Sequence, residues 1–189
     1  MYPQLQIIRD EFLSAQSRLH QLRADVPDGQ WPVRSQPERW SVSECVAHLN
    51  LTSAAFQPLV QAALAEGRRL GKPRSLRYRR DFTGWILWRT AGPPARFRSK
   101  TPSRFIPDAV RPPAELIADF DHFQAEQLDW VRLADGLPLN EIRIRSPFDA
   151  RVRYNLYSCL SILPRHQHRH LWQAEQVWAA RRTALAAGG

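Results

Sequence analysis

Three of the six histidines fall on predicted inward-facing helix stripes, where their imidazole nitrogens can share one divalent cation. His166 and His170 are four residues apart, so their side chains lie one turn apart on the same helix face. His48 lies on the apolar stripe of an earlier helix. Unpaired imidazoles are costly to bury. A metal site with an open fourth position would pair them. A polar cluster would also give them partners, if the histidine pair hydrogen-bonds Gln173 and backbone groups and His48 is an ordinary core residue. The spacing leaves both interpretations open.

The other three histidines are predicted to point away from that site. His20 and His122 fall off the apolar stripes of their helices. His168 is about 200° around the helix from His166, so it faces elsewhere. The predicted site therefore uses half of the histidines.

Two cysteines bear on the same chemistry. Cys45 lies three residues before His48, so it either packs as a small hydrophobic residue or approaches the site. As a fourth ligand it would close the site and make the metal structural rather than catalytic. Cys45 and Cys159 are too few for a disulfide framework, which favours a reducing compartment.

Four long helical patterns must position these side chains. Apolar residues recur at alternating spacings of three and four in each of them, which is typical of helices that bury one face. The patterns cover about residues 4–24, a second helix from the Ser41–Glu44 capping box toward Glu66 with Gly67 as its C-cap, a third from Pro112-Pro113 to Asp135-Gly136, and a fourth from Asn155 to at least Val177.

These patterns predict an all-α four-helix bundle that forms one domain over residues 1–189. A long crossover, residues 67–111, joins the second and third helices and lets them run parallel. A short helix is expected at Phe82–Ala91 within it. Residues 141–145 alternate like a strand and are predicted to pair with residues 152–154, which gives a short hairpin before the fourth helix.

Positive charge is concentrated in the crossover. The whole chain carries 27 Lys and Arg against 18 Asp and Glu, a net charge of +9. Residues 67–111 hold thirteen of the basic residues and two acidic ones, a net charge of +11, which leaves −2 for the rest. Arginines interleaved with aromatic residues suit nucleic acid or an anionic membrane surface. They equally suit a solvated loop, or a positive rim that steers an anionic thiol or substrate, and no recognised nucleic-acid motif is present.

Three segments together resemble the DinB/YfiT-like family of metal-binding four-helix bundles. They are WSVSECVAHL at residues 40–49, HQHRHLWQ at residues 166–173 and SPF at residues 146–148. The resemblance extends from the first helix to about Val177. It implies one divalent metal, nickel or zinc, held by three histidines that match His48, His166 and His170, and it implies a homodimer.

The resemblance also indicates a class of reaction. Some relatives are similar to bacillithiol transferases and mycothiol-dependent maleylpyruvate isomerase. A low-molecular-weight thiol at the open metal position would lose its proton and attack a small-molecule electrophile. This reasoning predicts a metal-dependent thiol S-transferase, although no catalytic or cofactor-binding residue is assigned. The alternatives are a metal-dependent hydrolase, a non-enzymatic binding module that uses residues 67–111, and a scaffold in which the metal only stabilises the fold.

Composition excludes several other classes of protein. The first residues, MYPQLQIIRDEFLSAQ, contain acidic side chains where a signal peptide needs a continuous apolar core. No apolar run approaches the ~18 residues typical of a membrane span. We therefore expect a cytoplasmic protein.

Overall fold

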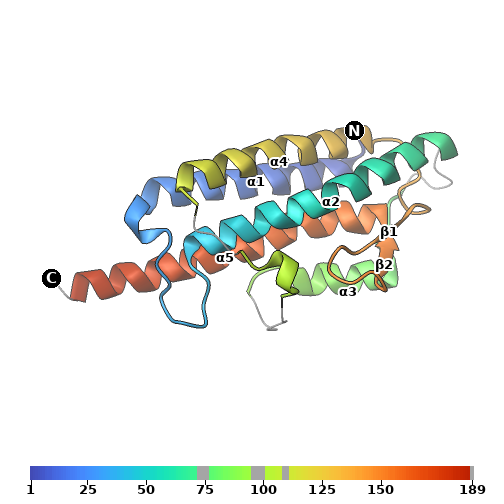
Figure 1. The fold of residues 1–189 in the computed structure, drawn as a ribbon. Coiled ribbons are helices and arrows are strands. Elements are labelled where there is room, and N and C mark those ends of the chain that lie inside the picture. The colour runs from blue at the N-terminus through green and yellow to red at the C-terminus, as the bar shows by residue number, and fades with distance from the viewer. Residues whose placement is uncertain (72–76, 95–100, 108–110, 188–189) are drawn as a thin grey trace.

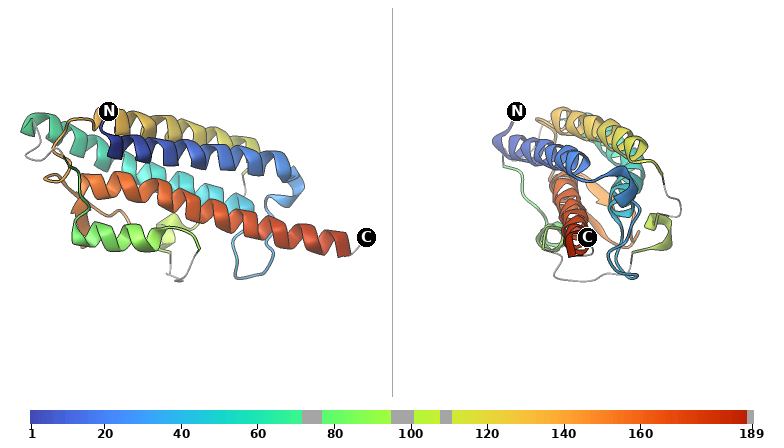
Figure 2. Two further views of the ribbon diagram at one scale, coloured as in Figure 1. Left: turned by 180° about the vertical axis from the view of Figure 1, so that it is seen from behind. Right: turned by 90° about the vertical axis from the view of Figure 1, so that its left-hand side faces the viewer.

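The long helices form the predicted four-helix bundle. The structure, a computed structural model, describes residues 1–71, 77–94, 101–107 and 111–187. In Figure 1, α2 and α4 run in one direction and α1 and α5 in the other, so the long crossover does join parallel helices. α1 and α2 each pack against both α4 and α5, as the end-on view in Figure 2 shows. The bounds are α1 Pro3–Asp25, α2 Val42–Leu70, α4 Pro113–Leu133 and α5 Leu156–Ala187.

Hydrophobic periodicity explains how α1 joins the bundle. Its six buried residues recur at spacings of three and four, which places them on one face toward the core. Proline at the start of α1 costs no hydrogen bond, because the first N–H groups of a helix have no partner within it. The buried residues are Leu5, Ile8, Phe12, Ala15, Leu19 and Leu22.

The start of α2 agrees with the prediction and its end does not. Ser41 and Glu44 form the capping box, in which each side chain bonds the backbone of the other residue. The predicted C-cap at Gly67 is wrong, since α2 continues to Leu70 and ends at Gly71, which has a φ of 79°. Gly67 is buried inside the helix, and a Cβ there would lie 2.9 Å from Cδ1 of Ile142. Glycine at this position lets the segment before the hairpin approach the helix closely.

The crossover contains one α-helix and one short turn among its described residues. α3, Phe82–Ala91, forms where the sequence predicts a short helix and packs on the outside of α5. Asp81 caps it by accepting a hydrogen bond from the N–H of Gly84. The 3₁₀ helix η2, Ser103–Phe105, lies against α2. Residues 72–76, 95–100 and 108–110 of the predicted crossover lie outside the described residues.

The predicted hairpin precedes α5, and its two strands begin two residues and one residue later than expected. β1, Arg143–Arg145, pairs antiparallel with β2, Arg153–Asn155. Asn155 then caps the start of α5, since its Oδ1 accepts a hydrogen bond from the N–H of Ser158. A second 3₁₀ helix, η1 at Asp28–Gln30, follows α1. None of the helices in the described ranges has the length and hydropathy that crossing a membrane requires.

Candidate metal centre

The structure brings together the three histidines that the sequence singles out. His48 lies in the second turn of α2, and His166 and His170 lie one turn apart on α5. The Nε2 atom of His166 is 3.4 Å from Nε2 of His48 and 3.1 Å from Nε2 of His170. One ring nitrogen from each residue lies within 4.8 Å of the other two. We call His48, His166 and His170 the histidine cluster.

The other three histidines lie elsewhere, as predicted. His20 contacts Asp121 and His122 lies near Glu126, both on exposed faces. His168 faces α1, where its Nδ1 accepts a hydrogen bond from Arg18 and its Nε2 contacts the backbone carbonyl of Glu11. Each of these histidines therefore has local partners outside the cluster.

A backbone contact fixes the tautomer of His48. Its Nδ1 lies 2.8 Å from the carbonyl oxygen of Phe105. A carbonyl can only accept, so Nδ1 carries the hydrogen and Nε2 keeps a free lone pair. This lone pair points at His166. The turn η2 of the crossover thereby orients a side chain on α2, in the way that second partners orient metal-binding imidazoles.

Neutral imidazoles alone cannot give both contacts of the histidine cluster a full hydrogen bond, because Nε2 of His166 has at most one hydrogen to share between them. Nε2 of His48 has no hydrogen to donate. Nε2 of His166 cannot donate to His48 and accept from His170 at once, because a ring nitrogen that carries hydrogen has no lone pair to offer. A divalent cation would accept a lone pair from all three nitrogens. The donor set therefore fits a divalent transition-metal ion.

Burial keeps the histidine cluster in the form that binds metals. It lowers the pKa of His166 to about 3, with the charges of His48 and Arg169 as further causes. Burial also lowers the pKa of His170 well below its usual value, and Gln173 acts weakly in the opposite direction. The pKa of His48 is lowered for the same reason, against the effect of its bond to Phe105. All three rings are neutral at pH 7, as metal ligands must be.

Aromatic side chains form the walls of the cluster. Trp40 lies 4.9 Å from His48 and 5.9 Å from His170 between ring centroids. Phe148, from the loop of the hairpin, lies 5.9 Å from His166 and 4.3 Å from Phe105 between ring centroids, with its ring tilted by 35° to that of Phe105. Residue types and spacing alone do not place these three aromatic residues at the site. Trp40 and Phe148 belong to the segments that carry the family resemblance, whereas nothing in the local sequence marks Phe105.

Cys45 does not belong to the site. Its side chain is fully buried in the core among residues of α1 and α2, and burial raises the pKa of its thiol to about 12. Among the described residues, no cysteine or carboxylate joins the three imidazoles as a fourth potential ligand. His166 keeps part of its surface exposed, while His48 and His170 are buried. The cluster thus has three protein donors and a side that faces solvent.

Comparison with known proteins agrees with this architecture. The sequence profile described as the DinB superfamily matches residues 11–174, a span that includes the histidine cluster. YfiT from Bacillus subtilis, described as "a probable metal-dependent hydrolase with an unusual four-helix bundle topology", has a similar fold. The two chains are 17% identical, and the match covers 95% of this chain and 87% of YfiT with a TM-score of 0.59. No curated protein matches the chain in sequence. Since the profile spans most of its length, this protein belongs to the DinB superfamily.

Proposed function

We propose that this protein is a divalent-metal-dependent enzyme, specifically a thiol S-transferase, whose metal is held by His48, His166 and His170. One observation carries the proposal: three neutral ring nitrogens face one point and cannot satisfy one another. Nickel or zinc bound there would favour the thiolate form of a low-molecular-weight thiol.

The residues around the cluster have separate roles in this proposal. The carbonyl of Phe105 holds the hydrogen of His48 on Nδ1, so that Nε2 stays available. The rings of Trp40, Phe105 and Phe148 exclude water from the buried side and offer an apolar surface to the electrophile. His166, the partly exposed member, lies on the side from which substrates would enter.

The surroundings favour a thiol over water as the nucleophile. A general base within hydrogen-bond reach assists the proton transfers of hydrolysis, typically by about 10²–10⁴-fold. Among the described residues, no carboxylate is near enough to affect the pKa of the three histidines. A free thiol has a far lower pKa than free water, so it ionises more readily at the same metal, even though metal-bound water also reaches a pKa of about 7. Hydrolysis remains the second candidate because YfiT carries that description.

Metal analysis tests the site itself. Protein purified without an affinity tag should contain nickel, zinc or another divalent metal, or bind it on titration. Less than ~0.2 equivalents with no rebinding would contradict the proposal. His170→Ala should weaken metal binding by more than about tenfold, since even the outer partners of metal ligands contribute that much. His168→Ala is the matched control on the same helix and should keep its metal, and equal losses would contradict the assignment.

An activity comparison separates the two candidate reactions. Metal-loaded protein should accelerate adduct formation between a low-molecular-weight thiol and monobromobimane, and it should leave p-nitrophenyl acetate largely intact. His170→Ala should abolish the metal-dependent rate. Ester hydrolysis without thiol transfer would replace the transferase by the hydrolase. The homodimer, the cytoplasmic location and the choice between nickel and zinc stay predictions, which size measurement, fractionation and metal analysis would check.

A further inference from the structure

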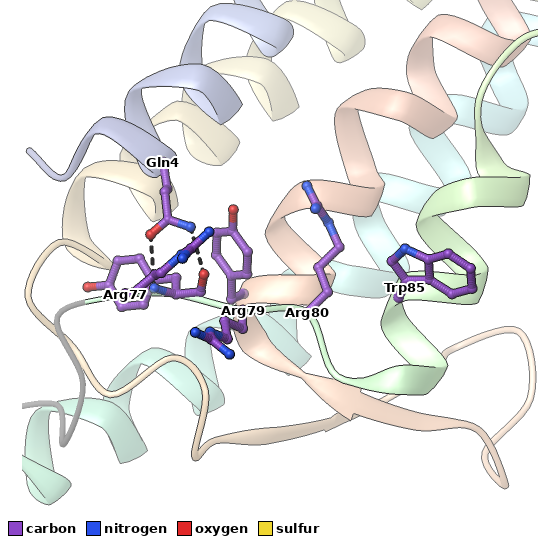
Figure 3. Close-up of a pocket in the computed structure, with 7 residues that line it drawn as sticks. Gln4, Arg77, Arg79, Arg80 and Trp85 are labelled. Carbon is purple, nitrogen blue, oxygen red and sulfur yellow. Dashed lines mark hydrogen bonds between the residues drawn. The ribbon is translucent and has the colours of Figure 1, made fainter.

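A second concave site lies away from the histidine cluster. It is a hollow of about 450 Å³ between the start of α1, the segment before α3 and the start of α5. Its lining includes Arg77, Arg79, Arg80, Trp85 and Tyr157. The first four of these are labelled in Figure 3. None of the three clustered histidines contributes to it. We call it the Arg80 hollow.

The Arg80 hollow carries positive charge that is only partly solvated. Arg80 is half-buried, donates from Nε to Oγ of Ser161, and lies 4.1 Å from the ring centroid of Trp88. Arg165 lies 4.2 Å from the same ring. Within the described ranges, neither guanidinium forms an ion pair with a carboxylate. Two cations that share one aromatic ring repel each other, so an anion nearby would be stabilised.

The acidic side chain that follows Arg80 in the sequence is already engaged. Asp81 follows Arg80 directly, but its Oδ2 is paired with Arg143. Its Oδ1 accepts hydrogen bonds from the N–H of Gly84 and the hydroxyl of Ser158. Asp81 therefore fixes the start of α3 instead of neutralising Arg80. In Figure 3, Arg77 and Arg80 extend to the same side of their segment, which places two cations along one edge of the hollow.

An exposed apolar face borders the Arg80 hollow. Phe82, Trp85 and Ile86 occupy one side of α3, and they are 77%, 51% and 39% exposed. Apolar residues that are three and four apart share one face of a helix. The opposite face is held in place, because Gly84 packs directly on Ser158 of α5. Trp85 both lines the hollow and belongs to the exposed face, so the charged and apolar surfaces are continuous.

We propose that the Arg80 hollow binds a phosphate monoester or diester, with the phosphate against Arg77 and Arg80 and the apolar part of the ligand against Trp85. Guanidinium groups match phosphate oxygens through two parallel hydrogen bonds. An indole ring supplies flat apolar contact. The phosphate can come from a soluble ester or from a phospholipid head group, whose acyl chains would then meet Phe82 and Ile86.

Two binding experiments on the full-length chain distinguish these sources. Isothermal titration calorimetry with phenyl phosphate tests a soluble ester. Co-sedimentation with phosphatidylglycerol vesicles, with phosphatidylcholine vesicles as the neutral reference, tests a lipid. Saturable binding of phenyl phosphate, or selective sedimentation with phosphatidylglycerol, is the expected result. In either case the affinity should fall as the salt concentration rises. No binding in either experiment would overturn the proposal.

Matched variants localise the binding. Arg80→Gln should weaken it at least about tenfold, a change of 1.4 kcal/mol. Arg182→Gln removes the same charge from an exposed position on the last turns of α5 and should change the affinity less than about twofold. If Arg80→Gln does not fold, Arg77→Gln at an exposed position takes its place. If Arg80→Gln (or Arg77→Gln in its place) and Arg182→Gln weaken phosphate binding equally, the proposal is overturned, because net charge would then explain binding. Loss of binding in His170→Ala alone would overturn it too, by placing the phosphate at the histidine cluster.

Discussion

The histidine cluster and the Arg80 hollow both set nitrogen-rich side chains against aromatic rings, yet their charges differ. In the cluster, burial lowers the pKa of each imidazole below its usual value of about 6.5, so the three rings stay neutral at pH 7. In the hollow, burial is also the main cause that lowers the pKa of Arg80. A guanidinium nevertheless keeps its charge at any pH that a protein experiences.

This difference determines what each region can bind. A neutral imidazole offers a lone pair to a cation, whereas a guanidinium offers hydrogen bonds to an anion. The aromatic neighbours follow the same division. Trp40, Phe105 and Phe148 exclude water from lone pairs, while the face of Trp88 stabilises the positive charge of Arg80 and Arg165. Burial beside an aromatic ring therefore underlies both the proposed metal site and the proposed anion site.

Metal addition should produce the largest effect. At a free metal concentration 1,000 times the dissociation constant, the free energy of unfolding should rise by about 4 kcal/mol, because the metal binds only the folded protein. The His48→Phe variant should gain almost no stability from the metal, because it lacks one of the three ligands. Phenylalanine keeps an aromatic ring at this position. Urea denaturation with and without metal measures both values. An equal gain in wild type and His48→Phe would show that the metal binds elsewhere.

The second-largest effect should be a loss of stability of the metal-free protein at low pH. The folded pKa of His166 is about 3, below the value of about 6.5 in the unfolded chain. The unfolded state therefore binds more protons, so stability that is present above pH 6.5 is lost as the pH falls. His166 alone should contribute a loss of about 2 kcal/mol between pH 7.5 and pH 5.

Two variants check the origin of this acid effect. His166→Gln should reduce the loss measured by urea denaturation at the two pH values, while the exposed His122→Gln should leave it nearly unchanged. His48 and His170 titrate in the same direction, and Arg169 is a charge that acts on both clustered residues of α5. The Arg80 hollow should add no pH dependence in this range, because guanidinium does not titrate there. An unchanged slope in His166→Gln would contradict the expected role of burial.

A substitution that displaces α3 should have a smaller effect, and it should change the Arg80 hollow without changing the histidine cluster. In Gly84→Ala, the new Cβ would lie 2.0 Å from Oγ and 2.2 Å from Cβ of Ser158, so α3 must shift. Overpacking of this kind costs about 1–3 kcal/mol, and the better helix propensity of alanine offsets up to about 1 kcal/mol. Phenyl phosphate binding should weaken while metal affinity stays the same. Gly29→Ala, with no atom within 4 Å of its new Cβ, is the control and should change neither.

The smallest effect should come from Arg165→Lys. Lysine keeps the charge but loses the flat contact with Trp88 and the hydrogen bond from Nε to the Trp88 carbonyl. Thermal unfolding should reveal a loss of about 1 kcal/mol or less. Phosphate affinity should stay within about twofold, since the net charge beside the hollow is unchanged. A tenfold loss of affinity would instead make Arg165 part of the binding surface.

Local sequence signals predicted the elements and most of their limits. The stripe of α1, the capping box of α2, the short helix α3 and the cap at Asn155 all formed where the spacing and the turn residues indicated. These features depend on neighbours within about four residues, so the sequence alone specifies them. The C-cap at Gly67 was wrong because glycine serves there for close packing against Ile142, a contact 75 positions away.

The same distinction between local and long-range effects applies to the candidate site. Residue type and helical spacing determined which faces carry His48, His166 and His170, since periodicity fixes the direction of a side chain. Only the tertiary structure decided that the carbonyl of Phe105 fixes the tautomer of His48 and that Cys45 turns into the core. The Arg80 hollow likewise depends on long-range packing, because its lining joins Gln4 of α1, the segment before α3 and Tyr157 of α5. Spacing within a helix is a local property, whereas the charge and access of a buried group depend on what long-range packing places around it.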